Sequence, residues 1–174
     1  MISITENGED LEFANVIDTT FKPLVYIFML TVETYVIVKI LSLLIGKIHA
    51  INQEKKRRFF MDRIVSDAFV LSADEFLRNP DAYENYVGVY VIYNRSQNLY
   101  YVGQATRTVD RLKSHLTGHG NGDVYADFKY GDEMFISIIP YELSFGSLND
   151  MEADFIEYYD AVENGYNKTK GNHH

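Results

Sequence analysis

The chain has 174 residues, a formal net charge of -9, fourteen tyrosines and no cysteine. This length predicts one compact domain with an extension. The lack of cysteine excludes disulfides, cysteine-based zinc sites and thiol nucleophiles. The sequence contains no internal repeat and no low-complexity tract.

The first two segments differ sharply in polarity. Residues 1–22 carry a net charge of -4, and residues 23–46 form a nearly continuous apolar run with charges at Glu33 and Lys39. A helix that is apolar all round is either deeply buried or spans a membrane, and residues 24–45 are long enough to span. Fourteen Leu, Ile, Val and Phe side chains at roughly -0.3 to -0.6 kcal/mol each nearly offset the two charges on the insertion scale. A transmembrane anchor and a soluble helix packed against the rest of the chain or a second copy therefore both fit.

Residues 47–83 are expected to form a basic helical connector. Residues 47–63 carry a net charge of +4, which under the positive-inside rule places the following module in the cytoplasm, at the inner face of the cell membrane, with the N-terminus outside. In a soluble protein the same bases would form a solvated helical turn. A capping box at Ser72 to Glu75 predicts a short helix that Pro80 ends. A cleavable signal peptide is not expected, because the apolar run is too long and lacks a small-residue cleavage pattern.

A β-hairpin is expected next. Residues 87–93 and 99–102 are rich in β-branched and aromatic side chains, and residues 94–98 between them have turn composition. Gly88 and Gly103 would lie where the backbone needs room.

The periodicity becomes helical after the hairpin, with apolar residues at Val109, Leu112 and Leu116. This helix is expected to stop at Gly118. Arg111 and His115 are four residues apart, so they project from one face. His115 and His119 also have the spacing of half a zinc site, but Gly118 breaks the helix between them and no cysteine completes a ligand set.

The last elements are a strand within residues 133–141 and a helix that begins at the capping residue Ser147 and ends near Gly165. The buried stripe of this helix is expected to consist of Met151, Phe155, Ile156 and Tyr159. Glu152 lies beside the stripe, so its carboxylate can point into a cleft and still reach solvent. The expected fold is α+β, with a small three-stranded antiparallel sheet flanked by helices, preceded by the long apolar helix.

The hairpin contains two tyrosine triplets with ten residues between them, Gly88-Val89-Tyr90 and Tyr101-Val102-Gly103. Together with the residues that follow them, they resemble the GIY-YIG nuclease family in type, order and spacing: Arg111, His115, Glu152 and Asn167. Valine replaces isoleucine in both triplets, which removes one methylene and no chemistry. The resemblance covers about residues 84–170 and implies that residues 84–174 form a nuclease domain.

The resemblance implies a metal-dependent endonuclease that hydrolyses DNA phosphodiester bonds. Glu152 would bind Mg²⁺ or Mn²⁺, since one carboxylate with water and substrate oxygens is enough for such a cation. Arg111 would stabilise the negative charge that develops on the phosphate, because its guanidinium is always charged and matches phosphate geometry.

The same resemblance assigns the remaining site residues. Tyr90 would be the general base, although an unperturbed phenol has a pKa of about 10 and therefore needs neighbouring cations. His115 would accept or relay a proton or bind the phosphate. Tyr101 would contact the phosphate or order the attacking water. Asn167, with the two glycines of the triplets, would support the site architecture.

The charge of this module limits its expected affinity for DNA. Residues 84–174 carry seven bases and thirteen acids, a net charge of -6, whereas DNA binding usually needs clustered bases. A local basic face remains beside the site, with Arg107, Lys113 and His119 as candidate DNA contacts. No base-reading motif is present, so low or structure-dependent sequence specificity is expected. The alternatives are a non-catalytic nucleic-acid-binding module and a membrane-anchored interaction protein, acting as a homo-oligomer or with a partner protein.

Overall fold

The computed structural model describes residues 17–171 and divides the chain into two compact units that meet between Lys55 and Lys56. The described part of the first unit contains a π-helical turn, η1 (Ile17–Phe21), and the beginning of helix α2 (Lys22–Asp67). The helix continues through Gly46, where the apolar segment was expected to end. One glycine inside a helix costs only about 1 kcal/mol, and the neighbouring residues favour a helix.

The second unit contains an antiparallel sheet of four strands in the order β1-β4-β2-β3. The strands are β1 (Phe69–Ser72), β2 (Gly88–Asn94), β3 (Leu99–Ala105) and β4 (Met134–Pro140). Three of these strands were predicted from the sequence, and the fourth was not. The additional strand, β1, comes from the connector and pairs Leu71 with Ile136. Its four residues are too short a run to show an alternating pattern of their own.

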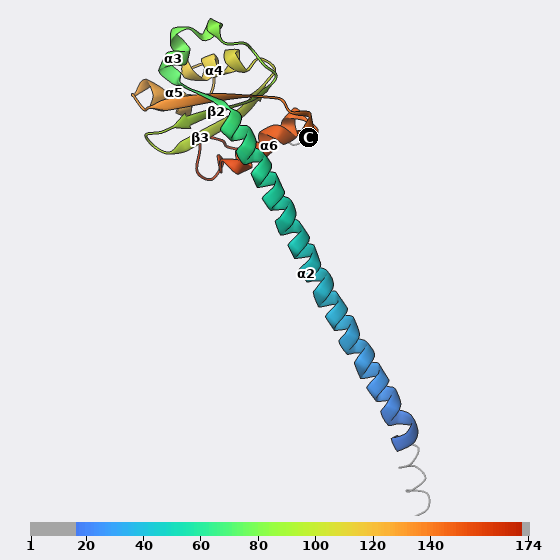
Figure 1. Ribbon diagram of the computed structural model, residues 1–174. Helices are drawn as coiled ribbons and strands as arrows, with labels where there is room; N and C mark the ends of the chain where they lie inside the picture. The colour runs from blue at the N-terminus through green and yellow to red at the C-terminus, as the bar shows by residue number, and fades with distance from the viewer. Residues whose placement is uncertain (1–16, 172–174) are drawn as a thin grey trace, which may run out of the picture. The chain divides into compact units, whose positions relative to one another are not determined.

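Helices cover both faces of this sheet (Figure 1). They are α3 (Ala73–Arg78), α4 (Thr108–Leu116), α5 (Gly122–Lys129) and α6 (Leu148–Tyr158), with 3₁₀ turns η2 (Pro80–Ala82) and η3 (Leu143–Phe145). On one face, α3, α4 and α5 enclose a core around Tyr90, Ile92 and Leu112. On the other face, α6 and residues 56–67 of α2 enclose a second core around Val91, Phe155 and Met61. Helices that pack on both faces of one antiparallel sheet confirm the α+β class.

Side-chain caps start two helices where the sequence predicted them. The Ser72 hydroxyl accepts a hydrogen bond from the backbone N–H of Glu75 at 3.2 Å. The Ser147 hydroxyl accepts from the backbone N–H of Asp150 at 3.1 Å and so starts α6. Each cap satisfies a donor that the first helical turn leaves free.

Helix α6 ends at Tyr158, well before the expected end near Gly165. Asp160 adopts a left-handed conformation with φ 50° and reverses the chain. The backbone N–H of Asp160 donates to the carbonyl of Glu157 at 3.1 Å, and that of Ala161 donates to the carbonyl of Ile156 at 3.0 Å. This pair of bonds is a Schellman motif, built here on aspartate rather than the usual glycine, which explains why the composition gave no stop signal.

The segment after α6 closes the outer edge of β3. The Asn167 side chain accepts from the Val102 backbone N–H at 2.9 Å and donates to the Val102 carbonyl at 2.8 Å. The backbone N–H of Tyr166 donates to the carbonyl of Tyr100 at 2.9 Å. One side-chain amide therefore replaces a neighbouring strand and satisfies backbone groups that an edge strand leaves unpaired.

We expect Asn167→Ala to lower the free energy of unfolding by about 1–3 kcal/mol, because it leaves the N–H and the carbonyl of Val102 without their partners. Thermal unfolding of the full-length chain, followed by near-ultraviolet circular dichroism, measures the change. Asn52→Ala is the matched control, since Asn52 lies exposed on α2. Equal stability of the Asn167→Ala variant and the control would contradict this role.

Candidate active site

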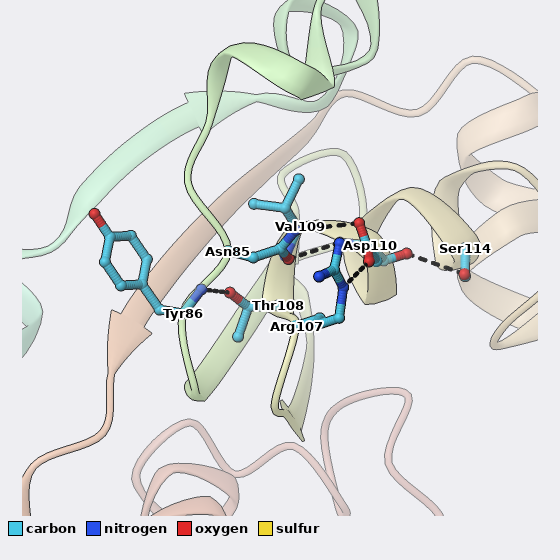
Figure 2. A network of polar contacts seen from close by, with 7 residues as sticks. All are labelled: Asn85, Tyr86, Arg107, Thr108, Val109, Asp110 and Ser114. Atoms are coloured by element: carbon cyan, nitrogen blue, oxygen red, sulfur yellow. Dashed lines mark hydrogen bonds and ion pairs between the residues drawn. The ribbon is translucent and has the colours of Figure 1, made fainter.

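The N-terminal turn of α4 sets the position of the helix that carries Arg111 and His115. Arg107 occupies the N-cap position but makes no cap hydrogen bond with its side chain. Asn85, in the loop before β2, caps the helix instead. Its Oδ1 accepts a hydrogen bond from the backbone N–H of Val109 at 2.9 Å (Figure 2). A cap supplied from 24 residues away fixes α4 against the start of β2.

The first half of the site is a cluster of three rings on the face of the sheet that α4 covers. Tyr90 comes from β2, Tyr101 from β3 and His115 from α4. The Tyr90 Oη and the His115 Nε2 are 2.9 Å apart, and both side chains are buried, with 1% exposed. The rings of Tyr101 and His115 lie 4.7 Å apart between centroids. The two tyrosine triplets and the helix thus converge on one point.

The hydrogen bonds of His115 define which of its nitrogens carries the proton. Its Nδ1 accepts from the backbone N–H of Asn121 at 2.8 Å. In a neutral imidazole the other nitrogen is then the donor, so Nε2–H donates to the Tyr90 Oη. His115 therefore donates its Nε2–H to the hydroxyl oxygen of Tyr90, and both side chains are buried.

Burial and the charge of Arg111 have opposite effects on the pKa of the two tyrosines. Desolvation raises the pKa of Tyr90 well above its ordinary value, and the nearby Arg111 guanidinium partly lowers it. Desolvation also raises the pKa of Tyr101, again with Arg111 opposing. Burial lowers the pKa of His115 to about 4, and the positive charge of Arg111 adds to this effect. Arg111 itself lies exposed, so the same guanidinium can face both the tyrosines and a ligand.

Two glycines make room for this cluster. A Cβ on Gly103 would lie 2.5 Å from Tyr90 Cζ and closer still to its hydroxyl, so the tyrosine ring can pack over β3 only because no side chain is there. A Cβ on Gly120 would lie 2.5 Å from His115 Nδ1 and would block its bond to Asn121. Gly88 begins β2 and lies opposite Pro140 of β4.

The second half of the site is the carboxylate of Glu152, on the other face of the sheet. Glu152 comes from α6 and is 8% exposed. Its Oε1 accepts from the Gln104 backbone N–H at 3.1 Å, and its Oε2 accepts from Gln104 Nε2 at 2.9 Å. Gln104 Nε2 also donates to Asn149 Oδ1 at 2.6 Å. The carboxylate is held by donors at both oxygens.

Strand β3 joins the two halves. Successive side chains of a strand point to opposite faces, so Tyr101 belongs to the ring cluster and Gln104 to the carboxylate. Burial is the main cause that raises the pKa of Tyr101, and the negative charge of Glu152 adds a smaller increase. Because β3 is the last strand of the sheet, groups from both faces can meet around its edge.

The described residues contain no group of three or more histidine, aspartate or glutamate side chains arranged for a metal ion. A preformed cage of protein ligands is therefore absent from residues 17–171. Glu152 fits a different kind of site, because Mg²⁺ is often bound through one or two carboxylates with water and substrate oxygens. A carboxylate that accepts two hydrogen bonds keeps further lone pairs for a cation.

The three expected DNA contacts lie just before α4, on it and in the loop after it. Arg107 is exposed but forms an ion pair with Asp110, which neutralises part of its charge. Lys113 is exposed on the same helix. His119 is exposed in the loop after α4, where its Nδ1 lies 3.2 Å from the hydroxyl of Thr117.

Sequence reasoning missed the polar residues that hold the functional ones. Gln104, Asn149, Asn85 and Asn121 each bond to a site residue or to the helix that carries it. For Gln104 a signal was present, because it follows the second triplet directly. Asn85 and Asn149 act through contacts across the fold, whereas Asn121 acts from the loop after α4, only six residues beyond His115. The sequence gave no signal for any of the three.

Comparison with known proteins identifies this part of the chain. The model of the GIY-YIG catalytic domain matches residues 86–167, so the chain carries a domain of the GIY-YIG family, as the resemblance predicted. Among solved structures, a mutant of the catalytic domain of intron endonuclease I-TevI matches with 26% sequence identity and a TM-score of 0.40, over 51% of this chain and 98% of that chain. No curated protein matches the sequence.

We expect the stability of the protein to fall as the pH drops from 6.5 towards 4, in part because His115 stays neutral in the folded state. Its pKa is lowered to about 4, so below 6.5 the unfolded chain binds a proton that the folded chain does not. The contribution of His115 to the free energy of unfolding therefore changes by up to about 1.4 kcal/mol per pH unit in this range and is fully present above pH 6.5. His115→Asn removes it and should give a shallower pH dependence of unfolding in this range. Equal slopes in the two proteins would contradict the buried neutral imidazole.

Proposed function

We propose that this chain is a metal-dependent endonuclease that hydrolyses DNA phosphodiester bonds with low or structure-dependent sequence specificity. One observation carries the proposal: the buried Tyr90–His115 pair with the exposed Arg111 beside it, and the held carboxylate of Glu152, lie on the two faces of the sheet at the edge strand β3. These are the groups that phosphodiester hydrolysis needs, namely a base, a cationic partner for the phosphate and a carboxylate for a metal. The family match at residues 86–167 supports the same reaction class.

Arg111 and Glu152 would bind partners of opposite charge, a phosphate and a divalent cation. Arg111 is exposed, and its guanidinium suits the oxygens of a phosphate, so it would stabilise the charge that develops there. Glu152 would hold Mg²⁺ or Mn²⁺ through its free lone pairs. When bound, such a cation would stabilise negative charge on phosphate and leaving oxygens. A module that only binds nucleic acid has no physical need for a carboxylate held in this way.

Tyr90 would accept the proton of the attacking water. Burial opposes formation of its phenolate, and two neighbours favour it: the charge of Arg111 and the Nε2–H that His115 donates to Oη. His115 acts as a fixed donor in this mechanism, because its Nε2 already carries a proton and its Nδ1 is bonded to Asn121. Tyr101, beside both rings, would contact the phosphate or the water.

The acidic charge of the chain should make DNA binding weak and sensitive to salt. Arg107 is paired with Asp110, and Arg57 of α2 contacts Asp154 at 2.7 Å and Glu157 at 2.8 Å. These bases are therefore partly neutralised by the protein itself. Lys113 and Arg111 are exposed basic residues on α4, and a small number of phosphate contacts implies a small release of counterions.

We expect the full-length chain to nick supercoiled plasmid DNA with Mg²⁺ or Mn²⁺ and not with EDTA. Tyr90→Phe should lower the rate at least about 100-fold, because it removes the base and keeps the ring. Glu152→Gln should lose metal-dependent nicking, because it removes the charge that holds the cation. Agarose-gel assays on duplex, branched and single-stranded DNA measure these rates and the preference for DNA structure.

The matched controls are Tyr130→Phe and Glu163→Gln, which change the same residue types at exposed positions outside the site. Both should nick at the wild-type rate. Absence of metal-dependent cleavage on every DNA structure, or full activity of Glu152→Gln, would refute the proposed nuclease.

We also propose that residues 24–45 anchor the chain in the cell membrane, with the N-terminus outside and the GIY-YIG domain in the cytoplasm. Among the described residues, α2 is the one helix long and apolar enough to cross a membrane. Its apolar side chains are exposed on all sides, including Tyr26 at 70% and Ile45 at 66%. A helix of this kind needs a bilayer or a second copy to cover it, and the basic residues that follow favour the bilayer.

We expect the full-length chain to stay in the membrane fraction after carbonate extraction. Ile37→Arg with Leu41→Arg should release it, because each charge near the bilayer centre costs about 2.5–3.5 kcal/mol. Ile51→Arg with Gln53→Arg is the control outside the apolar run and should not release it. A full-length chain that is soluble, as a monomer or as an oligomer, would contradict the anchor.

A further inference from the structure

We propose that Gln104 is a positioning residue that holds the Glu152 carboxylate in the orientation that binds the divalent cation. The inference rests on the metal role proposed for Glu152 and adds a residue that the tyrosine triplets do not include. It stands on three hydrogen bonds that one side chain and its own backbone make.

Gln104 donates a hydrogen bond to each of the two oxygens of the carboxylate. Its backbone N–H donates to Oε1 at 3.1 Å, and its Nε2 donates to Oε2 at 2.9 Å. Two donors on different oxygens prevent the carboxylate from turning about its last torsion. Glu152 is 8% exposed, so little water is present to replace a lost donor.

Asn149 fixes the amide of Gln104 in turn. The same Nε2 donates to Asn149 Oδ1 at 2.6 Å, so both amide protons of Gln104 face acceptors on α6. A flipped amide would place its carbonyl against the carboxylate of Glu152, and both contacts would be repulsive. Asn149 and Glu152 are one turn apart on α6, which lets one glutamine reach both.

The chemistry of glutamine suits this task. A carboxylate has about four lone-pair positions, and Gln104 uses two of them, which leaves the others for a cation. An amide orients the carboxylate without neutralising its charge. A lysine or an arginine at this position would hold the carboxylate too, but would compete with the cation for its charge.

The test compares Mn²⁺ binding by the full-length protein and its variants, measured from the electron paramagnetic resonance of free Mn²⁺. Gln104→Met keeps the length of the side chain and the backbone N–H but removes the Nε2 donor. We expect it to bind Mn²⁺ about 10–100-fold more weakly and to need correspondingly more Mg²⁺ for half-maximal nicking. Gln97→Met is the matched control, because Gln97 Nε2 donates to Asp132 at 2.6 Å outside the site, and it should bind as the wild type does.

A well-folded Gln104→Met variant with wild-type Mn²⁺ affinity overturns the proposal, as does a wild-type protein that binds no more Mn²⁺ than Glu152→Gln. If Gln104→Met does not fold, Asn149→Leu tests the same chain of contacts, because it releases the amide, and unchanged Mn²⁺ affinity in it overturns the proposal. Mn²⁺ binding that depends on Glu152 and Gln104 in a protein that nicks no DNA would refute the proposed nuclease and support the positioning role.

Discussion

The site depends on the space that Gly103 leaves in strand β3. The ring of Tyr90 lies across that position, and any side chain there would overlap its hydroxyl. The hydroxyl can therefore reach the Nε2–H of His115, which the backbone N–H of Asn121 holds as the donor. The missing Cβ thus allows the buried phenol to lie over β3 and to contact α4 and, through His115, the loop after it.

Strand β3 is also where the two halves of the site meet. The ring cluster lies on one face and Glu152 on the other, and β3 contributes to both through Tyr101 and Gln104. An edge strand would normally be free to fray or to pair with another chain. Asn167 prevents this by bonding both backbone groups of Val102. Its position between the two halves makes it a support for both.

The parts of the fold that the sequence predicted are those with local causes. The hairpin, the caps at Ser72 and Ser147 and the end of α4 before Gly118 depend on neighbouring residues. Strand β1 depends on pairing with β4, about 65 residues away, and its own pattern is too short to show it. The end of α6 at Asp160 was missed because aspartate rarely takes the left-handed role of glycine.

The residues of the candidate site also fall into two groups, those that the sequence predicted and those that only the structure shows. Residue types and spacing brought out the tyrosines, Arg111, His115 and Glu152, because a family motif is a local and ordered pattern. The direction of the His115 hydrogen bond depends on how the loop after α4 folds back to Asn121, and the partner of Glu152 is Gln104, 48 residues away in the sequence. Such partners are ordinary asparagines and glutamines, which composition cannot distinguish from surface residues.

The phenol on one face and the carboxylate on the other are proposed to act on one phosphodiester bond. Single-turnover nicking rates of the wild type, Tyr90→Phe, Glu152→Gln and the double variant test this proposal most directly. If the two residues form one site, the double variant will be no slower than the slower single variant, because either change already disables the reaction. Losses that multiply in the double variant, or a single variant with the wild-type rate, would contradict the account.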